Sequence, residues 1–189
     1  MTRALLVIDV QNDFTEGGAL GAVGGAAVAA GISAYLAENP DRYDHVFASR
    51  DWHDADSDNG GHISDHPDYV DSWPPHCIAG TPGAEYHPAL DTAAVDVHIR
   101  KGQGQPAYSI FEGTTDDGAT LPQKLRELGV DAVDVVGIAT DYCVRSSALD
   151  AAAFGLRTRV LGALSVGISP ETVAAAYDEL TESNVEVVR

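Results

Sequence analysis

The segment Val135–Asp150, VVGIATDYCVRSSALD, holds the residue with the clearest chemical potential in this chain. The apolar run Val133–Ile138 predicts a strand, Cys143 follows a short loop, and Val144–Phe154 predicts a helix. A thiol at a helix start lies near unpaired backbone N–H groups and the positive end of the helix dipole, which both favour the reactive thiolate. Cys143 is therefore a candidate nucleophile, although a buried and unreactive cysteine fits this segment equally well.

Two further candidates, Asp9 and Lys101, also stand where an apolar strand ends. Ligands of open parallel sheets bind at the carboxyl ends of the strands, so we expect both side chains to lie near Cys143. Lys101 is the natural partner of a buried Asp9 carboxylate, and its charge is expected to lower the pKa of the thiol. A purely structural ion pair is the alternative interpretation.

Together these three groups suit nucleophilic acyl transfer. Asp9 would take the thiol proton, Lys101 would hold both negative charges, and the thiolate of Cys143 would attack a carbonyl carbon. Backbone N–H groups in the loop Ile138–Cys143 would then stabilise the oxyanion.

A second set of residues suits a metal ion. Asp51 and His53 alternate along a strand end and so face the same side, and three more histidines follow at positions 62, 66 and 76. One carboxylate with several imidazoles suits divalent zinc, iron or manganese. A polar surface loop with incidental histidines is the alternative. A calcium loop of the EF-hand type is excluded, because Asn59 stands where that loop requires glycine.

Alternating strand and helix patterns must position these residues. Strands are expected at Ala4–Val10, His45–Arg50, Val95–Lys101, Ala132–Ile138, Thr158–Leu161 and Val185–Val188, and helices at Ala26–Ala37, Leu121–Leu128, Tyr142–Phe154 and Pro170–Glu182. This alternation predicts a single α/β domain over residues 1–189, with a central, mainly parallel sheet of about six strands and helices on both faces, in three layers. Residues 51–89 break the pattern as a long polar loop, which in a compact domain is usually functional or disordered.

The composition excludes some classes of partner. A net charge of −18 over 189 residues argues against binding to nucleic acid or to an anionic membrane. The two cysteines, Cys77 and Cys143, provide no disulfide framework, and there is no apolar leader or spanning segment. We therefore expect a cytoplasmic protein that is a monomer or a small homo-oligomer and acts on a small molecule.

Five motifs carry a family resemblance over nearly the whole chain: VIDVQNDFTEGGAL, SRDWH, SWPPHCIAGTPGAEYHP, RKGQGQPAYSIFEG and VVGIATDYCVRSSALDA. With them the chain resembles the nicotinamidase/pyrazinamidase family of the isochorismatase-like cysteine hydrolases. The resemblance implies the isochorismatase-like fold and the hydrolysis of nicotinamide to nicotinate and ammonia in NAD salvage, with pyrazinamide as a further substrate. It also implies one divalent transition metal ion, whose identity the sequence does not decide.

The resemblance assigns roles to single residues. Cys143 is implied as the nucleophile, Asp9 as the general base and Lys101 as the third catalytic member, while the backbone N–H groups of Ala139 and Cys143 are implied as the oxyanion hole. The implied metal ligands are Asp51, His53, His62 and His76. His66 has no counterpart, but a longer loop before it leaves the choice between His62 and His66 open.

The substrate ring is implied to lie between Phe14 and Trp73, with Tyr108 and Ile138 beside it, and the Ile138–Ala139 peptide is implied to be cis. Two other functions remain open. A related amidohydrolase would act on an N-carbamoyl or ureido group, although such relatives need no metal histidines. A catalytically silent metal-binding scaffold would leave the three catalytic residues unexplained.

Overall fold

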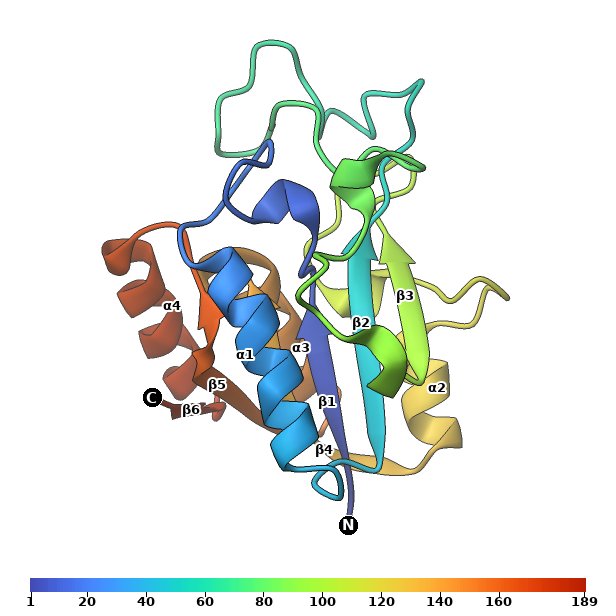
Figure 1. The fold of residues 1–189 in the computed structure, drawn as a ribbon, viewed down its shortest axis with the longest axis vertical. Coiled ribbons are helices and arrows are strands. Elements are labelled where there is room, and N and C mark those ends of the chain that lie inside the picture. Colours follow the sequence, from blue (N-terminus) through green and yellow to red (C-terminus); the bar gives the residue numbers. More distant parts are fainter.

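Six strands form one parallel sheet in the order β3-β2-β1-β4-β5-β6 (Figure 1). The computed structural model describes all of residues 1–189. The strands are β1 (Thr2–Ile8), β2 (His45–Asp51), β3 (Val97–Lys101), β4 (Val130–Ile138), β5 (Arg157–Val166) and β6 (Glu186–Val188). The predicted α/β class and the six-stranded parallel sheet are confirmed.

Four helices cover the two faces of this sheet, namely α1 (Gly25–Glu38), α2 (Leu121–Glu127), α3 (Arg145–Ala153) and α4 (Pro170–Glu182). The buried side of α1 packs with Leu5 and Val7 of β1 on one face, where Figure 1 shows α1 in front of the strands. Helices α2, α3 and α4 contribute to the core on the other face, with Leu6 and Ile8. This division follows from right-handed crossovers between parallel strands. From β1 to β2 the chain moves toward one edge of the sheet, and from β4 through β5 to β6 it moves toward the other edge, so the connecting helices lie on opposite faces.

The strand order places a crevice above the centre of the sheet. Strands β1 and β4 are neighbours, and the chain leaves them in opposite directions across the sheet. In open α/β sheets, such a reversal point is where ligands bind, outside the carboxyl ends of the two strands. Asp9 follows β1 directly and Cys143 lies five residues beyond β4.

Most predicted elements agree with the structure, and the differences lie at their ends. Strand β1 ends at Ile8 rather than Val10, and β5 continues to Val166 rather than stopping at Leu161. The prediction stopped β5 early because Gly162 and Ala163 have low strand propensity, whereas pairing with β4 resumes after a register shift. Helix α4 has its predicted bounds, and the Ser169 side chain caps it by accepting a hydrogen bond from Thr172 N–H.

The segment around Cys143 is wound differently from the prediction. Residues Thr140–Val144 form a π-helical turn, and the α-helix begins only at Arg145. Cys143 therefore lies inside this turn and not at the first residue before a regular helix. A single π-turn of this kind is found frequently at functional sites.

The long polar loop between β2 and β3 rises above the carboxyl ends of the strands, at the top of Figure 1. Two isolated bridges tie it together, one between His53 and Ile78 and one between Ile63 and Trp73. The loop thus forms a cap over the crevice. None of the helices has the length and apolar character needed to cross a membrane.

Candidate active site

The structure brings Asp9, Lys101 and Cys143 together at the carboxyl ends of β1, β3 and β4. The Nζ atom of Lys101 lies 2.9 Å from Oδ2 of Asp9 and 3.8 Å from Sγ of Cys143. All three residues are buried. The predicted convergence of a carboxylate, an ammonium group and a thiol is therefore confirmed.

Asp9 is held by its neighbour on β2. Its Oδ1 atom accepts a hydrogen bond of 2.7 Å from the hydroxyl of Ser49, and its backbone N–H donates to the same hydroxyl oxygen at 3.3 Å. Burial raises the pKa of the Asp9 carboxyl, and the charge of Lys101 only partly opposes this effect. A buried carboxylate with a raised pKa is a good proton acceptor near neutral pH.

The thiol of Cys143 differs from its prediction. Burial raises its pKa well above the usual value, and the nearby Lys101 opposes this shift without reversing it. The prediction of a lowered pKa was wrong, because it counted the positive groups near the thiol and not the loss of water around it. The resting group is thus a thiol, and the nearby Asp9 carboxylate adds to the rise of its pKa.

Asp51 connects Lys101 to the histidines. Its Oδ1 atom is in close contact with Nζ of Lys101, and its Oδ2 atom lies 3.6 Å from Nε2 of His53 and 3.9 Å from Nε2 of His76. Burial acts to raise the pKa of Asp51, but Lys101 and then His53 outweigh it and lower the pKa. The contact between Asp51 and Lys101 was not predicted, although the two residues end neighbouring strands and are partners in register.

Three buried histidines converge beside Asp51. One ring nitrogen from each of His53, His62 and His76 can be chosen so that all three lie within 4.8 Å of one another. Nδ1 of His53 is 2.8 Å from the carbonyl of Gly102, and Nδ1 of His76 is 2.8 Å from that of Pro74. Such contacts keep the proton on Nδ1, so that Nε2 presents its lone pair to the cluster.

The donor set fits a divalent transition metal ion. Nε2 of His53 and Nδ1 of His62 are buried and have no hydrogen-bond partner within the protein, as expected of atoms that ligate a metal. Burial, followed by the repulsion of His53 and His76, lowers the pKa of His62 to about 4, so its imidazole is neutral at pH 7. His66 is exposed and lies outside this group, so the geometry places His62 and not His66 beside the other two.

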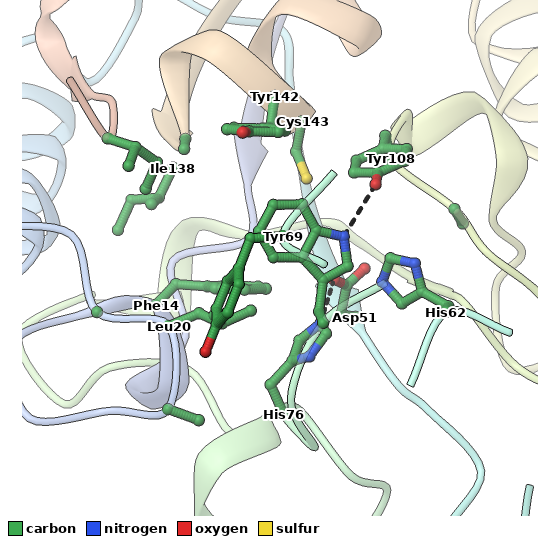
Figure 2. A pocket seen from close by; sticks show the side chains of 16 residues that line it. Phe14, Leu20, Asp51, His62, Tyr69, His76, Tyr108, Ile138, Tyr142 and Cys143 are labelled. Atoms are coloured by element: carbon green, nitrogen blue, oxygen red, sulfur yellow. Dashed lines mark hydrogen bonds and ion pairs between the residues drawn. The ribbon is translucent and has the colours of Figure 1, made fainter. Parts of the chain in front are cut away.

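A cavity of about 330 Å³ opens over these groups. Figure 2 shows the sulfur of Cys143 and the rings of His62 and His76 pointing toward it from different sides. Its lining is mostly apolar and includes the four residues predicted to bind the substrate, Phe14, Trp73, Tyr108 and Ile138. Four further lining residues were not predicted from the sequence, namely Leu20, Tyr69, Tyr142 and Ile168.

The aromatic walls of the cavity support one another. Nε1 of Trp73 donates a hydrogen bond of 3.0 Å to the hydroxyl of Tyr108, and the Trp73 ring meets the Tyr142 ring edge-on, with centroids 5.4 Å apart. On the other side, the Phe14 ring lies 5.6 Å from the imidazole of His76. A flat aromatic ligand therefore has rings to contact on several sides.

Ala139 borders the cavity next to Cys143. The Ile138–Ala139 peptide bond is cis, as the resemblance implies. The N–H of Ala139 donates no hydrogen bond within the protein. A free N–H at this position is a suitable donor for an oxyanion that forms beside the sulfur.

Gln11 is a buried supporting residue that was not predicted from the sequence. Its Nε2 donates to the carbonyls of Asp51 (2.9 Å) and Ala84 (2.8 Å), and its Oε1 accepts from the N–H of Asp51 (2.8 Å). The side chain thus hydrogen-bonds to the end of β2 as a further strand would, beyond the point where β1 stops. The only sequence signal was a polar amide inside the first motif, directly after the apolar stretch that also contains Asp9.

Comparison with known proteins agrees with this geometry. The model of the isochorismatase domain matches residues 3–189. The chain is 54% identical, over 98% of its length and 98% of the relative's, to a nicotinamidase/pyrazinamidase of Mycobacterium tuberculosis. Among solved structures, a pyrazinamidase of Pyrococcus horikoshii in complex with zinc is 34% identical, with a TM-score of 0.83 over 100% of this chain and 99% of the other. The protein PnC1 of L. infantum in complex with nicotinate is 33% identical, with a TM-score of 0.85 over 100% and 92%.

The family model covers nearly all of the chain, and the relatives share its length as well as its fold. The buried cysteine, carboxylate and lysine lie at the carboxyl edge of the sheet, where an enzyme of this architecture would have its active centre. We conclude that this chain belongs to the isochorismatase domain family.

Proposed function

We propose that this protein is a metal-dependent nicotinamidase, which hydrolyses nicotinamide to nicotinate and ammonia and accepts pyrazinamide as well. The observation that carries the proposal is the meeting of two sets of groups in one cavity. Cys143 borders the cavity with Asp9 and Lys101 behind it, and a histidine cluster borders it a short distance away. The 54% identity to a nicotinamidase/pyrazinamidase supports the same substrate class.

In the first half of the reaction, Asp9 takes the proton of the Cys143 thiol and the sulfur attacks the carboxamide carbon. The N–H groups of Ala139 and Cys143 donate to the oxygen that becomes negative. As the C–N bond breaks, Asp9 gives its proton to the leaving nitrogen, which departs as ammonia. Lys101 remains between Asp9, Asp51 and the sulfur and offsets their negative charges.

In the second half, a water molecule attacks the thioester carbon and Asp9 accepts a proton from that water. The C–S bond breaks, nicotinate leaves, and the proton on Asp9 returns to the sulfur. The overall balance is one carboxamide and one water consumed, with one carboxylate and one ammonium ion released, because the carboxylic acid that forms gives its proton to ammonia. Asp9 thus serves as base and acid in each half.

The metal ion would be held by Asp51, His53, His62 and His76, and zinc, iron and manganese all suit this donor set. When bound, the ion supplies a Lewis acid that orients the ring nitrogen of the substrate. The rings of Phe14 and Trp73 would contact the two faces of the pyridine, as the apolar lining of the cavity suggests. We propose a place in NAD salvage for this reaction, as the family resemblance implies.

The test is ammonia release by the purified, metal-loaded protein. We expect release from nicotinamide and pyrazinamide, much less from benzamide, which lacks the ring nitrogen, and none from an N-carbamoyl amine. Cys143→Ala should abolish release, while Cys77→Ala should retain it, since Cys77 is buried and does not border the cavity. Cleavage of the N-carbamoyl compound without cleavage of nicotinamide would favour the related amidohydrolase, and no cleavage at all would favour a silent scaffold.

A further inference from the structure

Two arginines and two aromatic rings cluster beside the segment that carries Asp51 and His53. We call Arg50, Trp52, Tyr86 and Arg100 the Trp52 cluster. The guanidinium carbon of Arg50 lies 4.7 Å from the ring centroid of Trp52 and 4.6 Å from that of Tyr86, and the guanidinium carbon of Arg100 lies 4.5 Å from the Trp52 ring. All three distances are within the range of cation–π attraction. None of these residues lines the cavity.

The two positive charges of this cluster repel each other, and the indole of Trp52 offsets that repulsion. Arg50 and Arg100 are partners in register on β2 and β3, and like charges at such positions repel. Each has one carboxylate, Arg50 with Glu85 at 2.7 Å and Arg100 with Asp116 at 3.0 Å. The Trp52 ring contacts both guanidinium groups and so adds an attraction that the two arginines share.

The backbone of Trp52 lies where the chain leaves the sheet. Strand β2 ends at Asp51, and the N–H of Trp52 still donates to the carbonyl of Lys101 at 2.8 Å. The next N–H, that of His53, donates instead to Cys77 of the long loop at 3.0 Å. One peptide unit joins Trp52 to each neighbour, so a rotation at Trp52 would move the side chains of both Asp51 and His53.

Side-chain alternation separates the two sets of groups. Along an extended chain, Asp51 and His53 point to one side and Arg50 and Trp52 to the other. Asp51 and His53 are almost fully buried and form the metal-facing side. The Trp52 cluster therefore acts from behind the ligands, without touching the cavity.

We propose that Trp52, held by Arg50 and Arg100, is a positioning residue that fixes the orientation of the metal ligands Asp51 and His53. The inference rests on the metal site of the proposed function and adds residues beyond its donor set. Loss of contacts that orient metal ligands typically weakens metal binding by about 10- to 100-fold. We expect an effect of this size on metal affinity when the indole is removed.

The experiment is a titration of the metal-stripped protein with Co²⁺, followed by the visible absorption of the bound ion and by competition with a chelator. Trp52→Leu keeps an apolar side chain but removes the ring, and Trp52→Phe restores a ring face for the guanidinium groups. Arg126→Met is the matched control, because the guanidinium carbon of Arg126 lies 4.8 Å from the centroid of the Phe154 ring in a cation–π pair that does not line the cavity. Thermal unfolding of each metal-free variant is recorded in parallel.

We expect Trp52→Leu to weaken Co²⁺ binding at least about tenfold and to change the absorption spectrum. Trp52→Phe should recover most of the affinity, and Arg126→Met should bind as the wild type does. Should Trp52→Leu fail to fold, Arg100→Met tests the same contact from β3, and weaker Co²⁺ binding is expected for it too. The positioning role alone would be overturned if a folded Trp52→Leu or Arg100→Met variant bound Co²⁺ with wild-type affinity. It would also be overturned if Arg126→Met weakened Co²⁺ binding equally. Absence of Co²⁺ binding by the wild type would overturn the metal site and this inference with it.

Discussion

Replacement of Gln11 by methionine tests how the end of β2 is held in place. Methionine has nearly the same length and flexibility as glutamine, so it can occupy the buried space without its hydrogen bonds. Three backbone groups then lose their partners, namely the N–H and carbonyl of Asp51 and the carbonyl of Ala84. Because Gln11 is fully buried, no water is available there to replace the amide.

The size of the effect follows from these three groups. A buried polar group that is left unpaired costs about 1 to 3 kcal/mol, and the gain from a more apolar side chain offsets part of the sum. We expect Gln11→Met to lower the free energy of unfolding of the metal-free protein by about 3 to 5 kcal/mol, a large share of the 5 to 15 kcal/mol typical of a domain. Activity should fall as well, since Asp51 loses its fixed orientation toward Lys101.

Urea unfolding followed by circular dichroism measures this difference. Asn12→Ala is the matched control, because its side chain makes a single exposed hydrogen bond of 2.7 Å to the carbonyl of Pro82. Its cost should remain at or below about 1 kcal/mol. If Gln11→Met unfolds within about 1 kcal/mol of the wild type, the amide does not hold the end of β2 and the reasoning is refuted.

Three further predictions concern the site itself. His62→Ala should remove most of the bound metal, whereas His66→Ala should retain it because His66 is exposed. Atomic emission on the purified protein measures the metal content. Equal loss of metal from both variants would contradict the assigned cluster. Ser49→Ala removes a hydrogen bond that lowers the pKa of Asp9, so the pKa of Asp9 should rise further. The acid limb of the pH profile of kcat/KM should therefore move to higher pH. An unmoved limb would mean that Asp9 is not the base. Trp73→Phe keeps a ring but loses the donor to Tyr108, and KM for nicotinamide should rise about fivefold with little change in kcat; a fall in kcat alone would argue against a binding role.

The sequence was sufficient for the sheet and for bringing together the three side chains that we propose as catalytic, because strand ends can be recognised from apolar runs. Asp9, Lys101 and Cys143 each follow or end such a run, and parallel strands bring these ends to one edge. The contact between Asp51 and Lys101 was missed because it depends on strand order. Only when β2 and β3 are neighbours in this register do the two side chains meet.

The choice between His62 and His66 depends on loop geometry that no periodicity reveals. The buried side chain of Asn59 accepts hydrogen bonds from the N–H groups of Asp54 (2.9 Å) and Gly104 (3.0 Å). These bonds anchor the loop start to the segment after β3. His62 then enters the cluster while His66 remains exposed.

The electrostatics of Asp9, Lys101 and Cys143 favour proton transfer within the site over a preformed thiolate. Burial raises the pKa of both Asp9 and Cys143, so neither group gains from being charged by itself. Transfer of one proton from Cys143 to Asp9 moves a negative charge from oxygen to sulfur but leaves the total charge around Lys101 unchanged. The desolvation cost of an additional buried charge is therefore avoided, because Lys101 faces one negative group of this pair before and after the transfer. In the mechanism that we propose, such a site keeps the cysteine protonated at rest and generates the nucleophile only as Asp9 takes up its proton.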